Sequence, residues 1–215
     1  MILAAGRGER MRPLTDATPK PLLKVQGEPL IERHVRALSA AGITRLTINL
    51  SWLGNQIRDY LGDGSRYGAR IVYSEEPRAL ETAGGIIHAL PLLAPGPFAV
   101  VNGDIFTDYR FETLTLAPGR DAHLVLVNNP PQHPQGDFGI KDGLAVNEAA
   151  RRFTFAGIAV YRVALFAGEP DGPAPLKPLL VRSMSKARCS AELFQGRWED
   201  VGTPERLAAL NACKE

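Results

Sequence analysis

The sequence predicts an α/β fold in which a doubly wound, mostly parallel sheet lies between two layers of helices. Short apolar or β-branched runs alternate with amphipathic stretches through the first half of the chain, a pattern typical of βαβ units. The 21 glycines and 17 prolines follow no repeat and separate many short elements. With 45% hydrophobic residues, the chain can bury one sizeable core. We therefore expect a single three-layer αβα domain over residues 1–215.

The expected elements follow one another without an obvious linker. Apolar residues at helical spacing predict a helix over residues 29–41, which Gly42 ends as a C-cap. Further helices are expected at 52–61, 83–93, 176–186 and 204–213, and strands at 2–5, 45–50, 70–73, 98–101, 123–127, 153–161 and 191–195. The Pro- and Gly-rich stretch 128–143 is either an insertion that covers a site or a surface loop.

Charge and apolar patterning exclude several classes of protein. The 25 Lys+Arg and 23 Asp+Glu give a net charge of +2, which argues against a nucleic-acid surface. The longest apolar runs are far below the roughly 18 residues of a membrane span, and no secretory signal is visible at the N-terminus. Cys189 and Cys213 form no CxxC pair, so neither a disulfide framework nor a zinc site is indicated. We expect a cytoplasmic protein without a membrane or nucleic-acid partner, of unknown oligomeric state.

A glycine-rich loop follows the first expected strand, where doubly wound folds bind nucleotides. Its string GRGERM, residues 6–11, lacks the third glycine of the dinucleotide fingerprint, and no GxxxxGK[ST] string occurs in the chain. Five basic residues stand against two acidic ones in residues 1–24. Backbone N–H groups and several cations suit one polyphosphate. A solvated basic loop is the alternative interpretation.

Two aspartates are candidate ligands for a divalent cation. Asp104 follows the buried strand 98–101, and Asp200 precedes the last expected helix. Carboxylate oxygens are what Mg²⁺ prefers, usually together with phosphate oxygens and water. The string DIF, residues 104–106, is not a DxD motif, which disfavours a glycosyltransferase that uses that motif. Asp200 can also belong to a helix start in which Thr203 is the N-cap and Pro204 the first helical residue.

These strings resemble a known enzyme family. LAAGRGERMRPLT (residues 3–15) and PKPL (19–22) resemble the signature loop of the sugar-1-phosphate nucleotidylyltransferases, and LETAGG (80–85), VNGD (101–104) and WEDVGTP (198–204) follow in the family's order. The resemblance covers about residues 2–212 and implies a Rossmann-like nucleotidyltransferase fold. It implies attack of a sugar-1-phosphate oxygen on the α-phosphorus of a nucleoside triphosphate, with loss of pyrophosphate. A phosphate monoester is already largely dianionic at neutral pH, so no general base is required.

Within the family, the chain is most similar to bacterial uridylyltransferases that use UTP and N-acetylmuramic acid 1-phosphate in peptidoglycan recycling. The short chain, the LETAGG string in place of LGTAG, and Gly136-Asp137-Phe138 carry this narrower match. Glucose 1-phosphate or mannose 1-phosphate with UTP, dTTP or GTP is the alternative. A catalytically silent regulatory subunit is disfavoured, because the candidate catalytic cations and carboxylates are all present.

The resemblance implies a role for each candidate residue. Arg10 would neutralise charge on the leaving pyrophosphate, Lys20 would bind the reacting phosphates, and Asp104 would act with Asp200 to hold Mg²⁺. Arg10, Lys20 and Asp104 are thus the expected catalytic residues. The expected nucleotide-binding residues are Gly6, Gly8, Glu9, Arg10, Lys20, Glu76, Ala79 and Asn102. The expected sugar-binding residues, mainly from 105–200, are Asn102, Asp137, Glu148 and Gly157.

One family feature is missing. Many relatives place a lysine from an EKP-like string against the sugar phosphate, and this chain has no such string, although Glu148 falls in the corresponding region. The candidate replacements are the metal itself or one of the basic residues Lys141, Arg151, Arg152 and Lys177.

Overall fold

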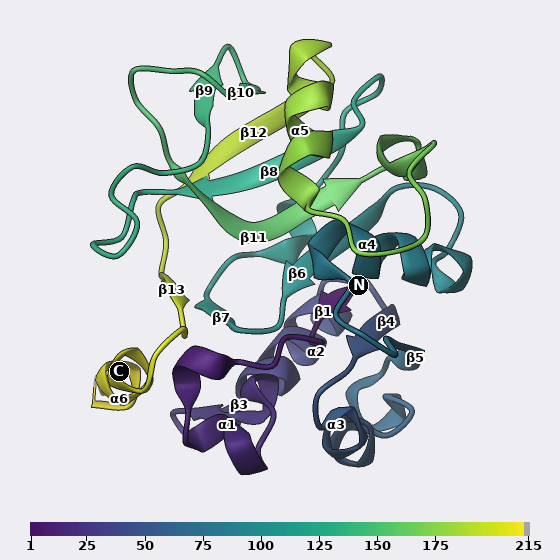
Figure 1. Cartoon of the computed structure of the whole chain (residues 1–215), viewed down its shortest axis with the longest axis vertical. Coiled ribbons are helices and arrows are strands. Elements are labelled where there is room, and N and C mark those ends of the chain that lie inside the picture. Colours follow the sequence, from purple (N-terminus) through teal and green to yellow (C-terminus); the bar gives the residue numbers. More distant parts are fainter. Residues whose placement is uncertain (213–215) are drawn as a thin grey trace.

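A computed structural model describes residues 1–212 and has a nine-stranded sheet at its centre (Figure 1). The strands are β1 (Ile2–Leu3), β4 (Arg45–Leu50), β5 (Arg70–Glu75), β6 (Phe98–Asn102), β8 (Ala122–Val127), β9 (Gly139–Lys141), β10 (Leu144–Val146), β11 (Thr154–Tyr161) and β12 (Cys189–Phe194). Their order is β5-β4-β1-β6-β11-β8-β12-β10-β9, and all but β11 and β10 point the same way. The expected mostly parallel sheet is confirmed.

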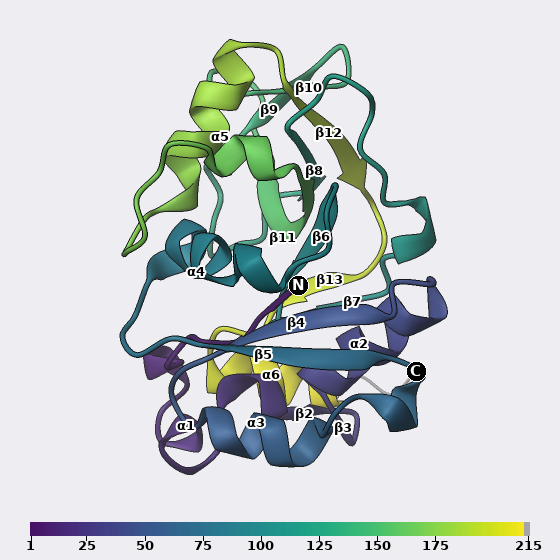
Figure 2. The ribbon, with the colours of Figure 1, turned by 90° about the vertical axis from the view of Figure 1, so that its right-hand side faces the viewer.

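Helices cover both faces of the sheet (Figure 2). They are α1 (Leu14–Ala17), α2 (Leu30–Ala40), α3 (Gly54–Leu61), α4 (Glu81–Ala89), α5 (Leu176–Ser185) and α6 (Pro204–Ala212). Successive residues of a strand point to opposite faces, so Val100 packs in the core beneath α4 and α5, whereas Val101 packs with α2 and α3. Two apolar cores, one on each face, hold the three layers together.

Several boundaries differ from the sequence prediction. The helix expected over 83–93 starts earlier, at Glu81, and ends at Ala89, followed by a 3₁₀ turn at Leu90–Leu92. Strand β9 and the start of the β9–β10 hairpin lie in the stretch 128–143, which the sequence predicts to be an insertion over a site or a surface loop. The expected end of the last helix, Cys213, lies outside the described residues. Within residues 1–212, no helix has the length and apolarity needed to cross a membrane.

Two small strand pairs are absent from the sequence prediction because such short strands show little periodicity. The pair β2 (Lys24–Val25) and β3 (Glu28–Pro29) forms a hairpin before α2. The pair β7 (Ile105–Thr107) and β13 (Trp198–Asp200) is antiparallel and joins segments about 90 residues apart along the chain. The second pair matters for function, because each strand carries or follows one of the candidate metal ligands.

Helix α6 returns the chain to the N-terminal loop (Figure 1). Thr203 caps the helix as predicted, since its Oγ1 accepts a hydrogen bond from Arg206 N at 3.4 Å. The helix buries its apolar side in a third core formed by Met11, Leu23, Val25, Leu30, Phe106, Val201, Leu207 and Leu210. This core ties the strand pair β7–β13 to the glycine-rich loop.

Candidate active site

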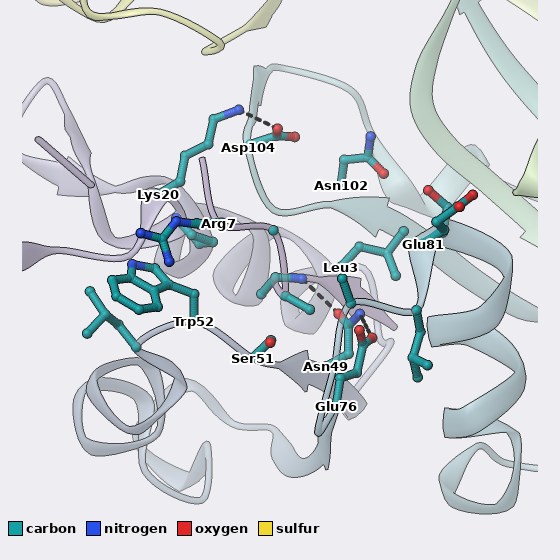
Figure 3. Close-up of a pocket in the computed structure, with 18 of the residues that line it drawn as sticks. Leu3, Arg7, Lys20, Asn49, Ser51, Trp52, Glu76, Glu81, Asn102 and Asp104 are labelled. Carbon is teal, nitrogen blue, oxygen red and sulfur yellow. Dashed lines mark hydrogen bonds and ion pairs between the residues drawn. The ribbon is translucent and has the colours of Figure 1, made fainter. Parts of the chain in front are cut away.

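A pocket of about 740 Å³ lies at the carboxyl ends of β1, β4 and β6 (Figure 3). The pocket is lined by residues 3–7, 20, 21, 49, 51–53, 76, 77, 79–82, 102 and 104. The strands β4 and β5 lie on one side of β1 and β6 lies on the other, so the strand order reverses at β1. In parallel sheets such a reversal opens a crevice at the carboxyl ends of the strands. The volume is typical of a pocket for a small ligand.

The inner end of this pocket, called the larger pocket below, contains a buried carboxyl group. Glu76 is only 7% exposed, and its Oε1 accepts a hydrogen bond from Asn49 Nδ2 at 2.6 Å. Asn49 Oδ1 in turn accepts from Ala4 N at 2.8 Å, so strands β1 and β4 orient the carboxyl group (Figure 3). Burial raises the pKa of Glu76 above the ordinary value of 4.5. Glu76 therefore offers a hydrogen-bond acceptor in a defined position.

The glycines of LETAGG make this arrangement possible. A Cβ on Gly85 would lie 2.5 Å from Glu76 Oε1, and a Cβ on Gly84 would lie 2.2 Å from the carbonyl oxygen of Gly172. Both positions need glycine because the neighbouring groups approach the helix too closely for a side chain. Glu81 has a φ of +58°, a conformation that glycine adopts without strain. This explains how LETAGG can match LGTAG at that position.

The glycine-rich loop contributes unevenly to the pocket. Gly6 and Arg7 line it, and the Arg7 guanidinium lies 4.1 Å from the centre of the Trp52 ring. Gly8 has a φ of +68° and packs against Thr15 and Lys20, so it shapes the loop. Neither Gly8 nor Glu9 lines the pocket, and the Glu9 side chain is largely exposed. Triphosphate binding by Gly8 and Glu9 stays a prediction.

A second, smaller pocket of about 290 Å³ adjoins the larger one and shares Asn102 and Asp104 with it. At this junction, Lys20 Nζ lies 2.5 Å from Asp104 Oδ2, and Lys20 is only 7% exposed. The other residues that line the smaller pocket are Arg10, Ile105, Pro130, Gln132, His133, Thr154, Phe155, Ala156, Trp198 and Asp200. Lys20 and Asp104 thus lie where the two pockets meet, and Arg10, the third expected catalytic residue, lines the smaller pocket.

The strand pair β7–β13 brings the two candidate metal ligands together. Asp200 lies opposite Ile105 in the register, and Val201 N donates a hydrogen bond to Asp104 O at 3.0 Å. Each carboxylate already contacts a cation: Lys20 for Asp104, and Arg206 Nη1 at 2.8 Å for Asp200.

Two carboxylates beside a pocket fit Mg²⁺, which usually takes one or two protein carboxylates and completes its shell with phosphate oxygens and water. Residues 1–212 contain no group of three or more His, Cys, Asp or Glu side chains suited to hold a metal ion. The two aspartates would therefore share the cation with bound phosphates.

Gly157 packs against Asn102, a residue that lines both pockets. It occupies a bulge in β11, where the pairing with β8 shifts between Phe155 and Ile158, and has a φ of +73°. A Cβ on Gly157 would lie 2.5 Å from Asn102 Nδ2. Gly157 therefore makes room for Asn102 and does not itself line either pocket.

The remaining sugar-site candidates lie outside the smaller pocket. Asp137 accepts a hydrogen bond from Phe155 N at 2.9 Å, and Glu148 is exposed beyond β10. The candidate replacements for the missing lysine also lie elsewhere. The Arg151 guanidinium lies over the Phe153 ring, and the Lys177 ammonium lies over the Phe138 ring. Arg152 donates a hydrogen bond to the backbone carbonyl of Asp137, and Lys141 is exposed. None of these residues lines the pocket, whereas Arg10 and His133 do.

Comparison with known proteins agrees with this geometry. A family model described as nucleotidyl transferase matches residues 1–154. The chain belongs to the nucleotidyl transferase family. This nucleotidyl transferase is 51% identical to N-acetylmuramate alpha-1-phosphate uridylyltransferase of Neisseria meningitidis, over 99% of the chain and 96% of the relative. It is 34% identical to the protein of the same name from Caulobacter vibrioides, over 99% of the chain and 95% of the relative.

Solved structures support the fold. The nucleotidyl transferase superimposes on a candidate glucose-1-phosphate thymidylyltransferase from Bacillus anthracis, in complex with sucrose, with a TM-score of 0.86. The match covers 98% of the chain and 92% of that structure at 22% identity. At that identity the likeness concerns the fold alone, and it confirms the predicted Rossmann-like fold.

Several residues of this nucleotidyl transferase were missed by the sequence reasoning. Trp52 and Trp198 each line one pocket, and Arg206 contacts Asp200 from α6. His133 lies in the stretch that was predicted only to be a loop or a cover. The two tryptophans could have been found only from their places in the sequence. Trp52 follows strand β4, and Trp198 lies within the string WEDVGTP.

Proposed function

We propose that this nucleotidyl transferase transfers a uridylyl group from UTP to N-acetylmuramic acid 1-phosphate, forming UDP-N-acetylmuramic acid and pyrophosphate. The 51% identity to the Neisseria uridylyltransferase, which extends over nearly the whole of both chains, carries this proposal. The two joined pockets agree with it, because a nucleotide and a sugar phosphate must react at one shared point. Asp104, which lines both pockets, and Lys20, which contacts it, support placing that point at the junction.

In the reaction, an oxygen of the sugar phosphate forms a bond to the α-phosphorus of UTP. The bond from the α-phosphorus to the oxygen bridging to the β-phosphate breaks, and pyrophosphate leaves with that electron pair. The second pKa of a phosphate monoester is about 6, so the nucleophile is already ionised at neutral pH. The protein therefore has to align the two phosphates and neutralise their charge.

We assign the triphosphate and the base to the larger pocket. Gly6 and Lys20 would contact the phosphates, and Arg10 would meet the leaving pyrophosphate where the loop crosses to the smaller pocket. Glu76 and Ala79 line the inner wall, where the Glu76 carboxyl could accept the imide N–H of uracil. Gly8 and Glu9 would act through the shape and backbone of the loop.

We assign the sugar phosphate to the smaller pocket, whose walls come mainly from residues 105–200. Asn102 would contact both substrates because it lines both pockets. Asp137 and Gly157 would support the sugar site through Phe155 and Asn102. Asp104 and Asp200 would hold Mg²⁺, which supplies charge neutralisation on the phosphate oxygens when bound. We place the reaction in the cytoplasm, in the recycling of peptidoglycan sugars.

A guanylyl transfer is the second candidate. The chain is 36% identical to mannose-1-phosphate guanyltransferase of Gibberella zeae, over 95% of the chain and 61% of that protein. Guanine presents two N–H donors on one edge, and a carboxylate such as that of Glu76 can accept both. The choice of base is therefore the part of the proposal that most needs a direct measurement.

Pyrophosphate release tests the proposal. The purified protein is assayed with four nucleoside triphosphates against N-acetylmuramic acid, N-acetylglucosamine, glucose and mannose 1-phosphates, with Mg²⁺ and with a chelator. We expect UTP with N-acetylmuramic acid 1-phosphate to give the highest kcat/KM and the chelator to abolish turnover. An Asp104→Asn variant controls for contaminating enzymes. A higher kcat/KM for another pair overturns the proposed substrates, and no turnover with any pair overturns the enzymatic role.

A further inference from the structure

His133 lines the smaller pocket and lies on a loop that has no role in the proposed reaction. The pocket also contains Arg10, Asp104 and Asp200, so this imidazole faces the same space as the candidate catalytic groups. Its side chain is 43% exposed, but Nε2 is buried beside Asp137, so a ligand can reach only the remainder of the ring. His133 is the one imidazole among the residues that line the two described pockets.

The loop holds His133 in place through its own hydrogen bonds. Two consecutive turns enclose it, because His133 N donates to Pro130 O at 2.9 Å and Gly136 N donates to His133 O at 3.2 Å. Asn129 Nδ2 donates to Pro134 O at 3.0 Å and to Arg152 O at 3.0 Å, which ties the loop to the start of β11. The position of His133 is thus set before any ligand binds.

The Gly136-Asp137-Phe138 segment completes this support. A Cβ on Gly136 would lie 2.6 Å from Asn129 Oδ1, so the turn requires glycine. Asp137 Oδ1 lies 3.2 Å from His133 Nε2, within ion-pair distance, while its Oδ2 accepts from Phe155 N. Phe138 anchors the segment in the core. Asp137 thus contacts the imidazole of His133 while it is itself held by the backbone of β11.

The other charged groups of the pocket already have partners or roles. Asp104 and Asp200 contact Lys20 and Arg206, and Arg10 is assigned to the pyrophosphate. His133 is therefore left to hydrogen-bond a second anionic group of the sugar, where the sugar carries one. N-acetylmuramic acid carries such a group, a lactyl ether with a carboxylate, which N-acetylglucosamine lacks.

We infer that His133 binds the lactyl carboxylate and so selects N-acetylmuramic acid 1-phosphate among the sugar phosphates. This inference rests on the proposed function. Asp137 is a positioning residue that acts through His133. The loop 128–137 is then part of the sugar site, the first of the two roles considered for this stretch.

Specificity ratios test this inference. With UTP and Mg²⁺, kcat/KM is measured for N-acetylmuramic acid 1-phosphate, for its neutral lactyl methyl ester and for N-acetylglucosamine 1-phosphate. In the unaltered protein we expect the acid to be preferred to the ester. The His133→Gln variant should reduce that preference about 10-fold or more, since one charge-assisted hydrogen bond is lost. The His133→Lys variant should retain a preference for the acid.

Gln135→Ala is the matched control, because Gln135 is exposed on the same loop and lines neither pocket. We expect it to keep the ratio of the unaltered protein. If the unaltered protein prefers N-acetylglucosamine 1-phosphate, the proposed function itself fails. If the unaltered protein prefers the acid and His133→Gln keeps that preference in full, the proposed function stands and the role of His133 is wrong.

Discussion

The two pockets that meet at Asp104 are built in different ways. The larger pocket comes from the first 104 residues, and each wall follows a parallel strand of one half of the sheet. The smaller pocket is assembled from residues 10, 102, 104, 105, 130, 132, 133, 154–156, 198 and 200, which belong to segments far apart in the chain. Its geometry depends on the pair β7–β13 and on the bulge at Gly157.

Under the proposed assignment, the larger pocket binds a substrate that many enzymes share, and the smaller pocket binds the substrate that sets specificity. The nucleoside triphosphate would be held by a local loop and one buried carboxyl group. The sugar phosphate must be distinguished from similar sugars, and the smaller pocket can change its lining through one loop without disturbing β1, β4 or β6. We therefore expect substitutions at the junction to affect both substrates, and substitutions in either pocket to affect one.

The largest effects are expected at the junction and at Arg10 in the smaller pocket. Lys20→Ala removes the cation assigned to the reacting phosphates, and Arg10→Ala removes the cation assigned to pyrophosphate. Each should lower kcat on the order of 10²-fold or more, because the lost interaction acts in the transition state. Steady-state kinetics with both substrates varied measures this. Lys24→Ala, which is exposed on β2, is the control, and unchanged turnover in either variant would refute its assigned role.

Gly157→Ala tests the smaller pocket. The new Cβ would lie 2.5 Å from Asn102 Nδ2 and 3.0 Å from Asn102 Cβ, so the Asn102 side chain has to move. Gly168→Ala has a similar φ, +83° against +73°, and open space around it, so it isolates the cost of the backbone conformation. We expect Gly157→Ala to be less stable than Gly168→Ala by about 1–3 kcal/mol in urea unfolding. Equal stability would mean that Asn102 is not held against the bulge.

Glu76→Gln tests the larger pocket through pH. Burial raises the pKa of Glu76 above 4.5, so the folded protein binds this proton more tightly than the unfolded chain does. The stability contributed by protonation is complete below about pH 4.5 and is lost as pH rises through the folded pKa. Glutamine stays neutral and still offers an oxygen to Asn49. We expect Glu76→Gln to gain stability relative to the unaltered protein as pH rises.

Urea unfolding at several pH values between about 4.5 and 8 measures this difference. Glu75→Gln is the control, because Glu75 is adjacent but exposed and contacts Arg58. A difference between Glu76→Gln and the unaltered protein that does not change with pH would show that burial does not control this carboxyl group.

Sequence reasoning located the larger pocket better than the smaller one. The glycine-rich loop and Asp104 could be predicted because each follows a strand with a clear apolar pattern. The proximity of Asp200 to Asp104 followed only from the family resemblance, since the three-residue strands β7 and β13 show too little periodicity. His133 could not be predicted, because a loop's path depends on contacts such as Asn129 with Arg152. Glu148 was chosen by region, and the structure places it outside both pockets.

The two tryptophans provide the most direct test of the two-pocket account, since Trp52 lines the larger pocket and Trp198 the smaller. Trp198→Phe leaves Trp52 as the sole tryptophan, and Trp52→Phe leaves Trp198. Fluorescence is excited selectively from tryptophan, and each ligand is added without the other. We expect UTP to change the emission of Trp52 and N-acetylmuramic acid 1-phosphate to change the emission of Trp198. A response of Trp198 to UTP with Trp52 unchanged would contradict the assignment of the nucleotide to the larger pocket.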